Sequence, residues 1–346
     1  MVKAAVVGST GYGGVELIRF LLQHPNVTIE AVLSSSQAGG LLSESYPHLQ
    51  GIYTGRLEEI IPAQLAEKVD VVFTATPSGV SSTLVPQLLD AGLKVIDLSG
   101  DFRLKNPEVY EKWYKHAAPP EDIQKQAVYG LSEIFEKDIA KATFITNPGC
   151  YATAAQLSFM PLLRTGWIDL NSIIIDAKSG VSGAGRGLNM MVHYSETNEN
   201  FKAYKVNKHQ HIPEIEQGLS VLAGRDITVT FTTHLVPMTR GIMTTSYVNV
   251  IADVTEEEIR EQIRAFYKGR KFVRIREAGV YPATKEVSGS NFCDIGISYD
   301  LRTKRLTIIT VIDNIVKGAA GQAIQNLNIM MGWDESTGLL LAPVYP

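Results

Sequence analysis

The first half of the chain alternates short apolar runs with segments in which apolar side chains recur at helical spacing. The apolar runs are rich in β-branched residues and are bounded by glycine or proline, which is typical of buried strands. They are Ala4–Val7, Ile29–Leu33, Val71–Ala75, Val95–Leu98 and Phe144–Thr146. Helical patterns lie between several of them, for example at Val15–Leu22 and Leu84–Leu89. This alternation predicts an α/β domain with a parallel, doubly wound sheet.

The second half has a different pattern, with longer strand candidates and few helices between them. These candidates are Ile227–Leu235, Met243–Ile251, Phe292–Ser298 and Leu306–Ile312. They predict an α+β domain with a mixed, largely antiparallel sheet. A helix is expected over Glu256–Tyr267, which follows an acidic, N-cap-like segment. Another is expected over Ala319–Met331, and a length of 346 residues indicates two domains.

Composition and charge are those of an ordinary globular enzyme. The chain has 45% hydrophobic and 20% charged residues, and 32 Lys and Arg against 36 Asp and Glu give a net charge of −4. No long basic run is present, so we expect no nucleic-acid partner. The apolar N-terminal run is too short for a signal peptide, and no segment approaches the length of a membrane span. Two cysteines without metal-ligand spacing favour the reducing cytoplasm and no bound metal.

A glycine-rich turn follows the first strand and opens the first helix. It reads Gly8-Ser9-Thr10-Gly11-Tyr12-Gly13-Gly14, with Thr10 where the common dinucleotide fingerprint has its second glycine. In this position, backbone amides and a helix N-terminus meet a pyrophosphate. The turn therefore predicts a Rossmann-type, dinucleotide-binding domain, and a tight turn that binds nothing is the alternative.

The end of the second strand bears on which dinucleotide is bound. NAD sites usually have an acidic residue there for the ribose 2′-hydroxyl. Here the strand runs into Ser34, Ser35 and Ser36, so hydroxyls stand where a carboxylate would repel a 2′-phosphate. This favours NADP(H), although no arginine is close in sequence, and an ordinary polar loop is the alternative.

One cysteine, Cys150, follows the turn Asn147-Pro148-Gly149, between the strand-like Ala142–Thr146 and an apolar helical run, Ala154–Leu163. A thiol at a helix N-terminus is favoured as thiolate, whereas most lone cysteines are small buried apolar residues. A thiolate beside a dinucleotide domain can accept an acyl group from phosphate as a thioester, which hydride then reduces to an aldehyde.

Two histidines and several arginines are candidates for the rest of such a site. His209 and His211 precede a helix that begins at Pro213, and an imidazole there could carry a proton. Two polar side chains at the surface without a chemical role are the alternative, and no third metal ligand is nearby in the sequence. Arg103 follows a parallel strand and suits either a phosphate or a structural ion pair. The glycine-rich Ser179–Gly187, which contains Arg186, could hold an anionic substrate or be a plain loop. Arg240 lies in the segment His234–Gly241, which joins two strands and offers another guanidinium.

Taken together, these motifs resemble the N-acetyl-γ-glutamyl-phosphate reductase family over essentially the whole chain. The resemblance rests on Gly8–Gly14, Asp97–Arg103, Asn147–Thr153, Ser179–Arg186, His209–Glu214, His234–Gly241 and Asp313–Gln322. The family is similar to aspartate-semialdehyde dehydrogenase in fold and reaction, and typically forms homodimers or homotetramers. It implies a discontinuous first domain, 1–149 with 314–346, and a catalytic, substrate and oligomerisation domain over 150–313.

The resemblance also implies roles for individual residues. Cys150 would be the nucleophile and His211 the acid/base, with His209 as the alternative acid/base. The implied substrate-binding residues are Arg103, Asn147, Ser179, Gly180, Arg186, His209, Glu214 and Arg240. The implied cofactor-binding residues are Pro77 and Asn314, in addition to the glycine-rich turn and Ser34–Ser36.

The expected activity is the NADPH-dependent reduction of an acyl phosphate in arginine biosynthesis. The small-molecule substrate would be N-acetyl-L-glutamyl 5-phosphate, reduced to the 5-semialdehyde through a thioester on Cys150. Aspartyl phosphate and a carrier-bound aminoadipyl phosphate are the alternative substrates. A dinucleotide-binding regulator that has lost the chemistry and a cysteine hydrolase are alternatives from other classes.

Overall fold

The computed structural model describes residues 1–345, and the chain forms two compact units. The first unit comprises Met1–Pro148, Gly185–Gly187 and Ala319–Leu340. The second comprises Gly149–Ala184, Leu188–Gly318 and the segment from Leu341. The C-terminal segment of the first unit thus begins at Ala319, whereas the sequence analysis placed the start of that segment at residue 314.

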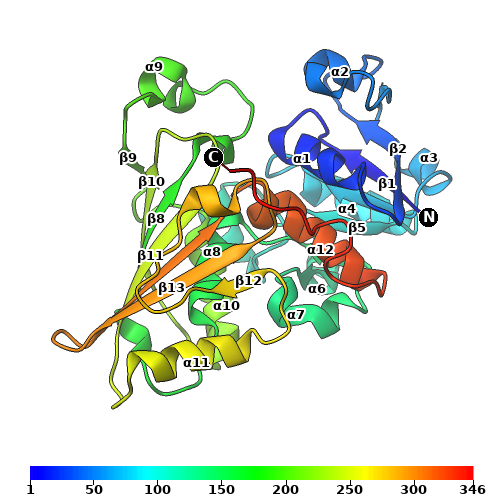
Figure 1. The fold of residues 1–346 in the computed structure, drawn as a ribbon. Helices are drawn as coiled ribbons and strands as arrows, with labels where there is room; N and C mark the ends of the chain where they lie inside the picture. The colour runs from blue at the N-terminus through cyan, green and yellow to red at the C-terminus, as the bar shows by residue number, and fades with distance from the viewer. Residues whose placement is uncertain (346) are drawn as a thin grey trace. The chain divides into compact units, whose positions relative to one another are not determined.

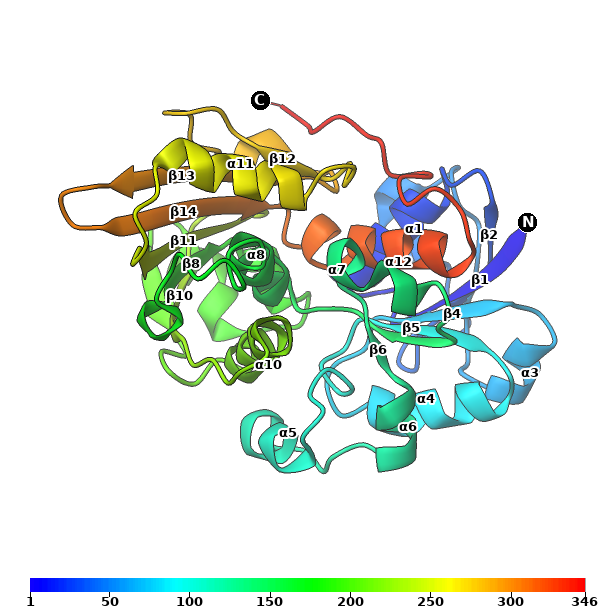
Figure 2. The ribbon, with the colours of Figure 1, turned by 90° about the horizontal axis from the view of Figure 1, so that it is seen from below.

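The first unit contains a seven-stranded sheet in the order β3-β2-β1-β4-β5-β7-β6. All of its neighbouring strands are parallel, so the predicted doubly wound α/β sheet is confirmed. The central strands β1, β4 and β5 are mostly apolar and buried because helices cover both faces, as Figure 2 shows for α1, α7 and α12 on one face and α4 on the other. The strands are β1 (Val2–Val7), β2 (Val27–Leu33), β3 (Leu57–Glu58), β4 (Val71–Thr74), β5 (Lys94–Asp97), β6 (Val128–Tyr129) and β7 (Phe144–Thr146).

The C-terminal helix of the first unit packs beside α1 and α7 (Figures 1 and 2). Its buried amides tie it to the sheet edge, because Asn326 donates to the Gly130 carbonyl and to Asn147 Oδ1. The predicted helix is confirmed, and a π-helical turn, Val316–Ala320, precedes it. The helices are α1 (Tyr12–Leu21), α2 (Leu42–Ser45), α3 (Pro62–Ala66), α4 (Ser81–Asp90), α5 (Pro107–Tyr114), α6 (Glu121–Gln126), α7 (Ser132–Ile139) and α12 (Gly321–Met330).

The second unit contains a mixed seven-stranded sheet in the order β12-β13-β14-β11-β8-β10-β9. Only β8 with β10 and β12 with β13 are parallel pairs, so the predicted mixed, largely antiparallel sheet is confirmed. The strands are β8 (Ile174–Ser179), β9 (Lys202–Tyr204), β10 (Thr230–Leu235), β11 (Ile242–Asn249), β12 (Val273–Ile275), β13 (Cys293–Asp300) and β14 (Arg305–Ile312). The strand β8, which the sequence analysis missed, lies in the interior of this sheet.

Helix α8 is the buried helix of the second unit and packs against α10, β11 and β14. Helix α10 begins at His211, two residues before the predicted start, because Pro213 is tolerated within the first turn. The helices are α8 (Cys150–Phe159), α9 (Tyr194–Thr197), α10 (His211–Ala223) and α11 (Glu256–Phe266). Short 3₁₀ turns occur in the two units at Pro47–Leu49, Leu170–Ser172, Val181–Ala184, Met190–Val192 and Thr284–Val287.

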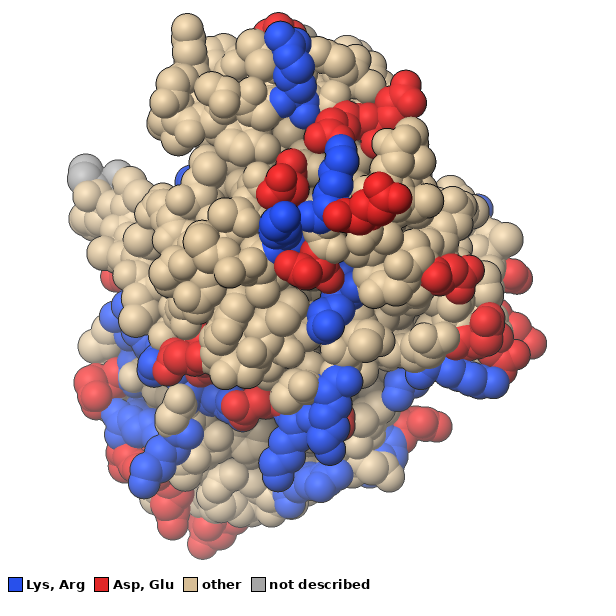
Figure 3. Space-filling view, turned by 90° about the vertical axis from the view of Figure 1, so that its right-hand side faces the viewer, with Lys and Arg blue, Asp and Glu red and all other residues tan. Residues whose placement is uncertain are grey.

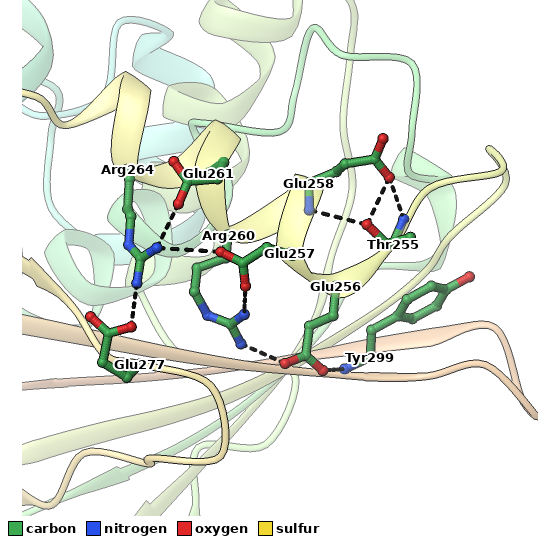
Figure 4. Close-up of polar contacts among 9 residues, drawn as sticks. All are labelled: Thr255, Glu256, Glu257, Glu258, Arg260, Glu261, Arg264, Glu277 and Tyr299. Carbon is green, nitrogen blue, oxygen red and sulfur yellow. Dashed lines mark hydrogen bonds and ion pairs between the residues drawn. The ribbon is translucent and has the colours of Figure 1, made fainter.

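Helix α11 shows why its sequence predicted it well (Figure 4). Thr255 Oγ1 accepts a hydrogen bond from the Glu258 N–H, and the Glu258 carboxylate accepts one from the Thr255 N–H. This capping box satisfies two donors at the helix N-terminus. Arg260 then pairs with Glu256, whose other oxygen accepts from the Tyr299 N–H and joins the helix to β13.

On the face drawn in Figure 3, Lys and Arg side chains intermix with Asp and Glu side chains. Among residues 1–345, no helix has the length and apolar character needed to cross a membrane.

Candidate active site

The glycine-rich turn of the first unit is packed so tightly that side chains are excluded from parts of it. Gly8 has a φ of +79°, and a Cβ on it would lie 2.4 Å from the Ala75 carbonyl oxygen. A Cβ on Gly14 would lie 2.3 Å from the Gly8 carbonyl oxygen. Helix α1 follows with no side-chain cap and no acidic residue in its first turn. Its N-terminal amides therefore suit an anion such as a pyrophosphate, so the turn fits a dinucleotide.

Hydroxyl groups flank this turn at the carboxyl ends of β1 and β2. Ser9 is buried, and its Oγ donates to the Leu33 carbonyl at 3.1 Å, which fixes the turn against β2. Ser34 is buried and lies 3.5 Å from the Ser36 hydroxyl, oxygen to oxygen. Ser35 and Ser36 are exposed, as are Tyr12 in α1 and Pro77 after β4. Gly11 and Gly13 have no such close approach to backbone, the nearest being the Gly8 oxygen at 3.4 Å from a Cβ on Gly11.

Arg103 and Asn147 lie together at the carboxyl edge of the first sheet. Arg103 is buried, and its Nε donates to the Asn147 carbonyl at 2.8 Å while Nη2 donates to the Leu98 carbonyl at 2.7 Å. The Asn147 amide donates to the Ala319 carbonyl and accepts from Asn326. The guanidinium is therefore held in a fixed orientation by backbone oxygens.

Asp97, at the end of β5, is a buried carboxyl whose role the sequence analysis did not assign. Burial raises its pKa, and hydroxyl donors from Thr74, Ser99 and Ser81 oppose that increase. The neighbouring Asp101 accepts from the backbone of the loop after β4, at Gly79. These carboxyls order the loops around the sheet edge.

In the second unit, Cys150 is the first residue of α8 and is partly buried. The predicted placement of the sulfur at a helix N-terminus is confirmed. The Gly149 N–H, at the cap of this helix, donates to Glu214 Oε1 at 2.7 Å, and the Glu214 side chain is fully buried. Gly318 packs against the cysteine so closely that a Cβ there would lie 2.7 Å from Cys150 Cβ.

His209 and His211 form an aromatic cluster with Tyr151, the residue after the cysteine. The ring centroid of Tyr151 lies 5.2 Å from that of His209 and 6.0 Å from that of His211. The His211 N–H, at the start of α10, donates to His209 Nδ1 at 3.1 Å. Burial, followed by the charges of His211 and Lys205, lowers the pKa of His209 to about 2. His209 is therefore a neutral imidazole whose Nδ1 accepts and whose proton is on Nε2.

A tyrosine pair adjoins this cluster and was missed by the sequence analysis. The Tyr204 hydroxyl donates to the Tyr151 hydroxyl at 3.0 Å, and the latter donates to the His234 carbonyl at 3.3 Å. Burial raises the pKa of both phenols, and negative charge on Cys150 raises them further. Both hydroxyls therefore stay protonated near the thiol at neutral pH. No signal in the local sequence joins β9 to α8.

Four further predicted residues of the second unit lie at the end of β8 or in the turns that follow β8, β10 and β14. A Cβ on Gly180 would lie 2.7 Å from the Thr239 carbonyl oxygen. Asn314 accepts from the Gly241 N–H at 2.7 Å and donates to Ser182 Oγ at 2.9 Å, so its amide joins two loops. Arg240 pairs with Asp313 at 3.4 Å. Ser179, expected in a loop, is the last residue of β8 and is buried.

Arg186 is a predicted substrate residue that contacts the glycine-rich turn of the first unit. It belongs to the short segment Gly185–Gly187 of the first unit, and donates to the carbonyls of Thr10 and Ser45. The structure thus brings one predicted substrate residue to the glycine-rich turn. Among residues 1–345, no group of three His, Cys, Asp or Glu side chains is placed to hold a metal ion.

Comparisons with known proteins define the class first. Residues 3–142 match the family model described as semialdehyde dehydrogenase, NAD binding domain, and residues 150–314 match semialdehyde dehydrogenase, dimerisation domain. Aspartate semialdehyde dehydrogenase II from Vibrio cholerae superposes with a TM-score of 0.73 at 17% identity, over 96% of this chain and 98% of that one. The enzyme from Candida albicans, solved with NADP, gives 0.68 at 18% identity, over 96% and 98%. The chain has the semialdehyde dehydrogenase fold and binds a nicotinamide dinucleotide.

More similar relatives define the family. Proteins named N-acetyl-gamma-glutamyl-phosphate reductase are 57% identical in Geobacillus sp. (strain WCH70), over 99% of both chains, and 55% identical in Brevibacillus brevis, over 100% of both. The one from Bacillus subtilis is 51% identical over 99% of this chain and 100% of its own length. The chain belongs to the N-acetyl-γ-glutamyl-phosphate reductase family, which confirms the resemblance found in its motifs.

Proposed function

We propose that the chain reduces N-acetyl-L-glutamyl 5-phosphate to N-acetyl-L-glutamate 5-semialdehyde and phosphate, with NADPH, in arginine biosynthesis. The observation that carries the proposal is Cys150 at the first position of α8. The chain is 57% identical to a relative named N-acetyl-gamma-glutamyl-phosphate reductase. A reductase of this kind needs a thiol and a dinucleotide site. The second unit contains the thiol, and the first unit contains the glycine-rich turn proposed to bind the dinucleotide. The cytoplasm supplies the reducing conditions that such a thiol needs.

Cys150 is the nucleophile of the first step. Its thiolate, favoured by the N-terminal amides of α8, attacks the acyl carbon, and the C–O bond to phosphate breaks to leave a thioester. The oxygen of the tetrahedral intermediate is stabilised by amides at the start of the same helix. Arg103, held by the carbonyls of Asn147 and Leu98, neutralises the departing phosphate.

Bound NADPH supplies the hydride that reduces the thioester carbonyl. The amides of Gly8–Gly14 hold its pyrophosphate, and the Ser34–Ser36 hydroxyls favour a 2′-phosphate over the bare ribose of NAD. No carboxylate ends β2 to repel that phosphate, since the strand ends at Leu33. Pro77 and Asn314 complete the proposed cofactor-binding set.

His211 moves the proton of the second step. It donates a proton to the hemithioacetal oxygen and takes it back as the C–S bond breaks and the aldehyde leaves. His209 is unsuited to this task, because with a pKa of about 2 its imidazole stays neutral. Its Nδ1 instead accepts the His211 N–H and orients the first turn of α10. His209 is thus a positioning residue.

The substrate and the assembly follow from the second unit. In the second unit, substrate binding is proposed for Ser179, Gly180, Glu214 and Arg240, and in the first unit for Arg103 and Asn147. The match of residues 150–314 to a dimerisation domain supports a homodimer or homotetramer.

The test is the reverse reaction with NADP and phosphate, offered three semialdehydes in turn. We expect turnover with N-acetyl-L-glutamate 5-semialdehyde and little with aspartate semialdehyde or carrier-bound aminoadipate semialdehyde. Preference for either of the latter two would overturn the substrate. Dinucleotide binding without turnover of any of them would indicate a regulator that has lost the chemistry.

A further inference from the structure

Arg186 is an exposed cation held in the first unit entirely by neutral groups. Its Nη1 donates to the Thr10 carbonyl at 3.2 Å and its Nη2 to the Ser45 carbonyl at 3.1 Å. The guanidinium carbon lies 4.5 Å from the centre of the Tyr46 ring, and the Tyr46 hydroxyl donates to the same Thr10 carbonyl at 2.9 Å. In the described part of the chain, no carboxylate pairs with Arg186. Its positive charge is therefore fixed in place but not neutralised.

Of the two carbonyls that hold Arg186, one belongs to the glycine-rich turn and the other to Ser45, the last residue of α2, which contacts the loop after β2. Thr10 lies in the glycine-rich turn, where it stands in place of the fingerprint's second glycine. The Ser45 hydroxyl donates to Gln37 Oε1 at 2.7 Å, and Gln37 directly follows Ser36 at the end of the serine loop. A short chain of contacts thus joins the guanidinium to the loop beyond β2, where the 2′-position of the adenosine ribose is recognised.

A 2′-phosphate needs a cation as well as hydroxyl donors, and the sequence around Ser34–Ser36 has no arginine. The structure supplies one from 176 positions along the chain. A planar guanidinium suits phosphate because it can donate two parallel hydrogen bonds, and the Tyr46 ring restrains its plane. Both carbonyls are weak competitors for the guanidinium, since a dianionic phosphate is the stronger acceptor.

We infer that Arg186 pairs with the 2′-phosphate of NADP(H), so that the coenzyme preference depends on a residue from the loop that follows β8. The inference rests on the proposed use of NADPH and deepens it. It gives Arg186 a role at the cofactor in place of the substrate role predicted from the sequence.

The test is direct titration of the full-length protein with NADPH and with NADH, followed by the fluorescence of the reduced nicotinamide. Arg186→Gln should weaken NADPH binding by roughly 10- to 100-fold and NADH binding by less than about 3-fold. Arg186→Lys should lose less NADPH affinity, because it keeps the charge but not the paired geometry. The unchanged NADH affinity shows that the turn remains folded in each variant.

Arg56 offers a matched control. It is also exposed, lies in the first unit and donates to one backbone carbonyl, but that carbonyl belongs to Gly39 (2.9 Å) and not to the glycine-rich turn. Arg56→Gln should leave both affinities unchanged. Equal losses of NADPH and NADH in Arg186→Gln, or a selective loss in Arg56→Gln instead, would overturn the inference. A wild-type protein that binds NADH as tightly as NADPH would instead refute the proposed use of NADPH.

Discussion

In the first unit the candidate site is made mainly of backbone, whereas in the second it is made mainly of buried side chains. The glycine-rich turn excludes a Cβ at Gly8 and Gly14 because other backbone atoms already fill that space. Around Cys150, by contrast, the packing comes from the side chains of Tyr151, His209 and Glu214, all buried. A backbone site is damaged by adding an atom, and a side-chain site by removing one.

The two helix N-termini at these sites also differ in what already occupies them. Helix α1 begins at Tyr12, and its N-cap residue Gly11 provides no side-chain cap, so the N-terminal amides remain available to an anion. At α8 the Glu214 carboxylate accepts the Gly149 N–H, so part of the capping demand is met by the protein itself. The first arrangement suits a ligand that comes and goes, and the second suits a residue held permanently in one position.

The largest expected effect is on the second unit alone. Cys150→Ser should lower the rate of phosphate-dependent semialdehyde oxidation by at least roughly 10³-fold, because a hydroxyl is a far weaker nucleophile than a thiolate. NADPH affinity, measured by fluorescence titration, should not change, since the turn lies in the other unit. Cys293 is fully buried, so alkylation of the native protein reports on Cys150. Turnover retained in the variant would exclude the thioester.

Substitution of His211 and of His209 should affect kcat and its pH dependence differently. His211→Asn should lower kcat by roughly 10²–10⁴-fold, as loss of a general acid/base does. His209→Asn should lower kcat by only about 10-fold while keeping the shape of the kcat against pH profile, because it removes a hydrogen bond to the His211 backbone. If His209→Asn instead abolishes a limb of the profile and His211→Asn does not, the two roles are exchanged.

The sequence predicted much of the fold because both sheets are built from runs that are apolar or alternate regularly. The exceptions are instructive. Strand β8 escaped because Asp176 and Lys178 make it look polar, although the two side chains simply pair at 2.6 Å on one face of the sheet. Strands β3 and β6 span two residues each, too short for any periodic pattern. Local pattern therefore fails where a strand is short or where charges neutralise each other.

The candidate site was predictable only where its chemistry is local in sequence. The turn before Cys150 predicts a helix N-terminus, and the Gly8–Gly14 spacing predicts a phosphate-binding site. The Tyr204–Tyr151 hydroxyl pair spans 53 positions and the contact of Arg186 with Thr10 spans 176. No periodicity encodes such pairs, since they arise from how the chain returns on itself.

Glycine-to-alanine substitutions test the difference between the backbone-built turn of the first unit and the surroundings of Cys150 in the second. Gly14→Ala places a Cβ 2.3 Å from the Gly8 oxygen, so we expect a loss of about 1–3 kcal/mol in stability and weak NADPH binding, with Cys150 alkylation unchanged. Gly318→Ala should alter Cys150 alkylation and leave NADPH binding unchanged, because its Cβ would lie 2.7 Å from Cys150 Cβ. Gly187→Ala is the control in the first unit, since nothing lies within 4 Å of a Cβ placed on it. Impaired NADPH binding in that control would show that more than backbone contact is involved.

Acid should destabilise the second unit more than the first through their buried histidines. With a folded pKa of about 2 against an ordinary 6.5, His209 stays neutral while the unfolded chain takes up a proton below pH 6.5. The free energy of unfolding then falls as pH falls, by about 2 kcal/mol between pH 7.5 and 5. In the first unit, burial lowers the pKa of His24 too, but hydrogen bonds with Asn328 and Thr337 oppose the shift.

Urea unfolding across that pH range should therefore show a flatter dependence for His209→Asn than for the wild type, and a smaller flattening for His24→Asn. The comparison is made as a difference from the wild type at each pH, so that carboxyl groups common to all three proteins cancel. An unaltered slope in His209→Asn would mean that its imidazole is protonated in the folded protein. It would then be cationic beside His211, and the assignment of His209 as a neutral positioning residue would have to be abandoned.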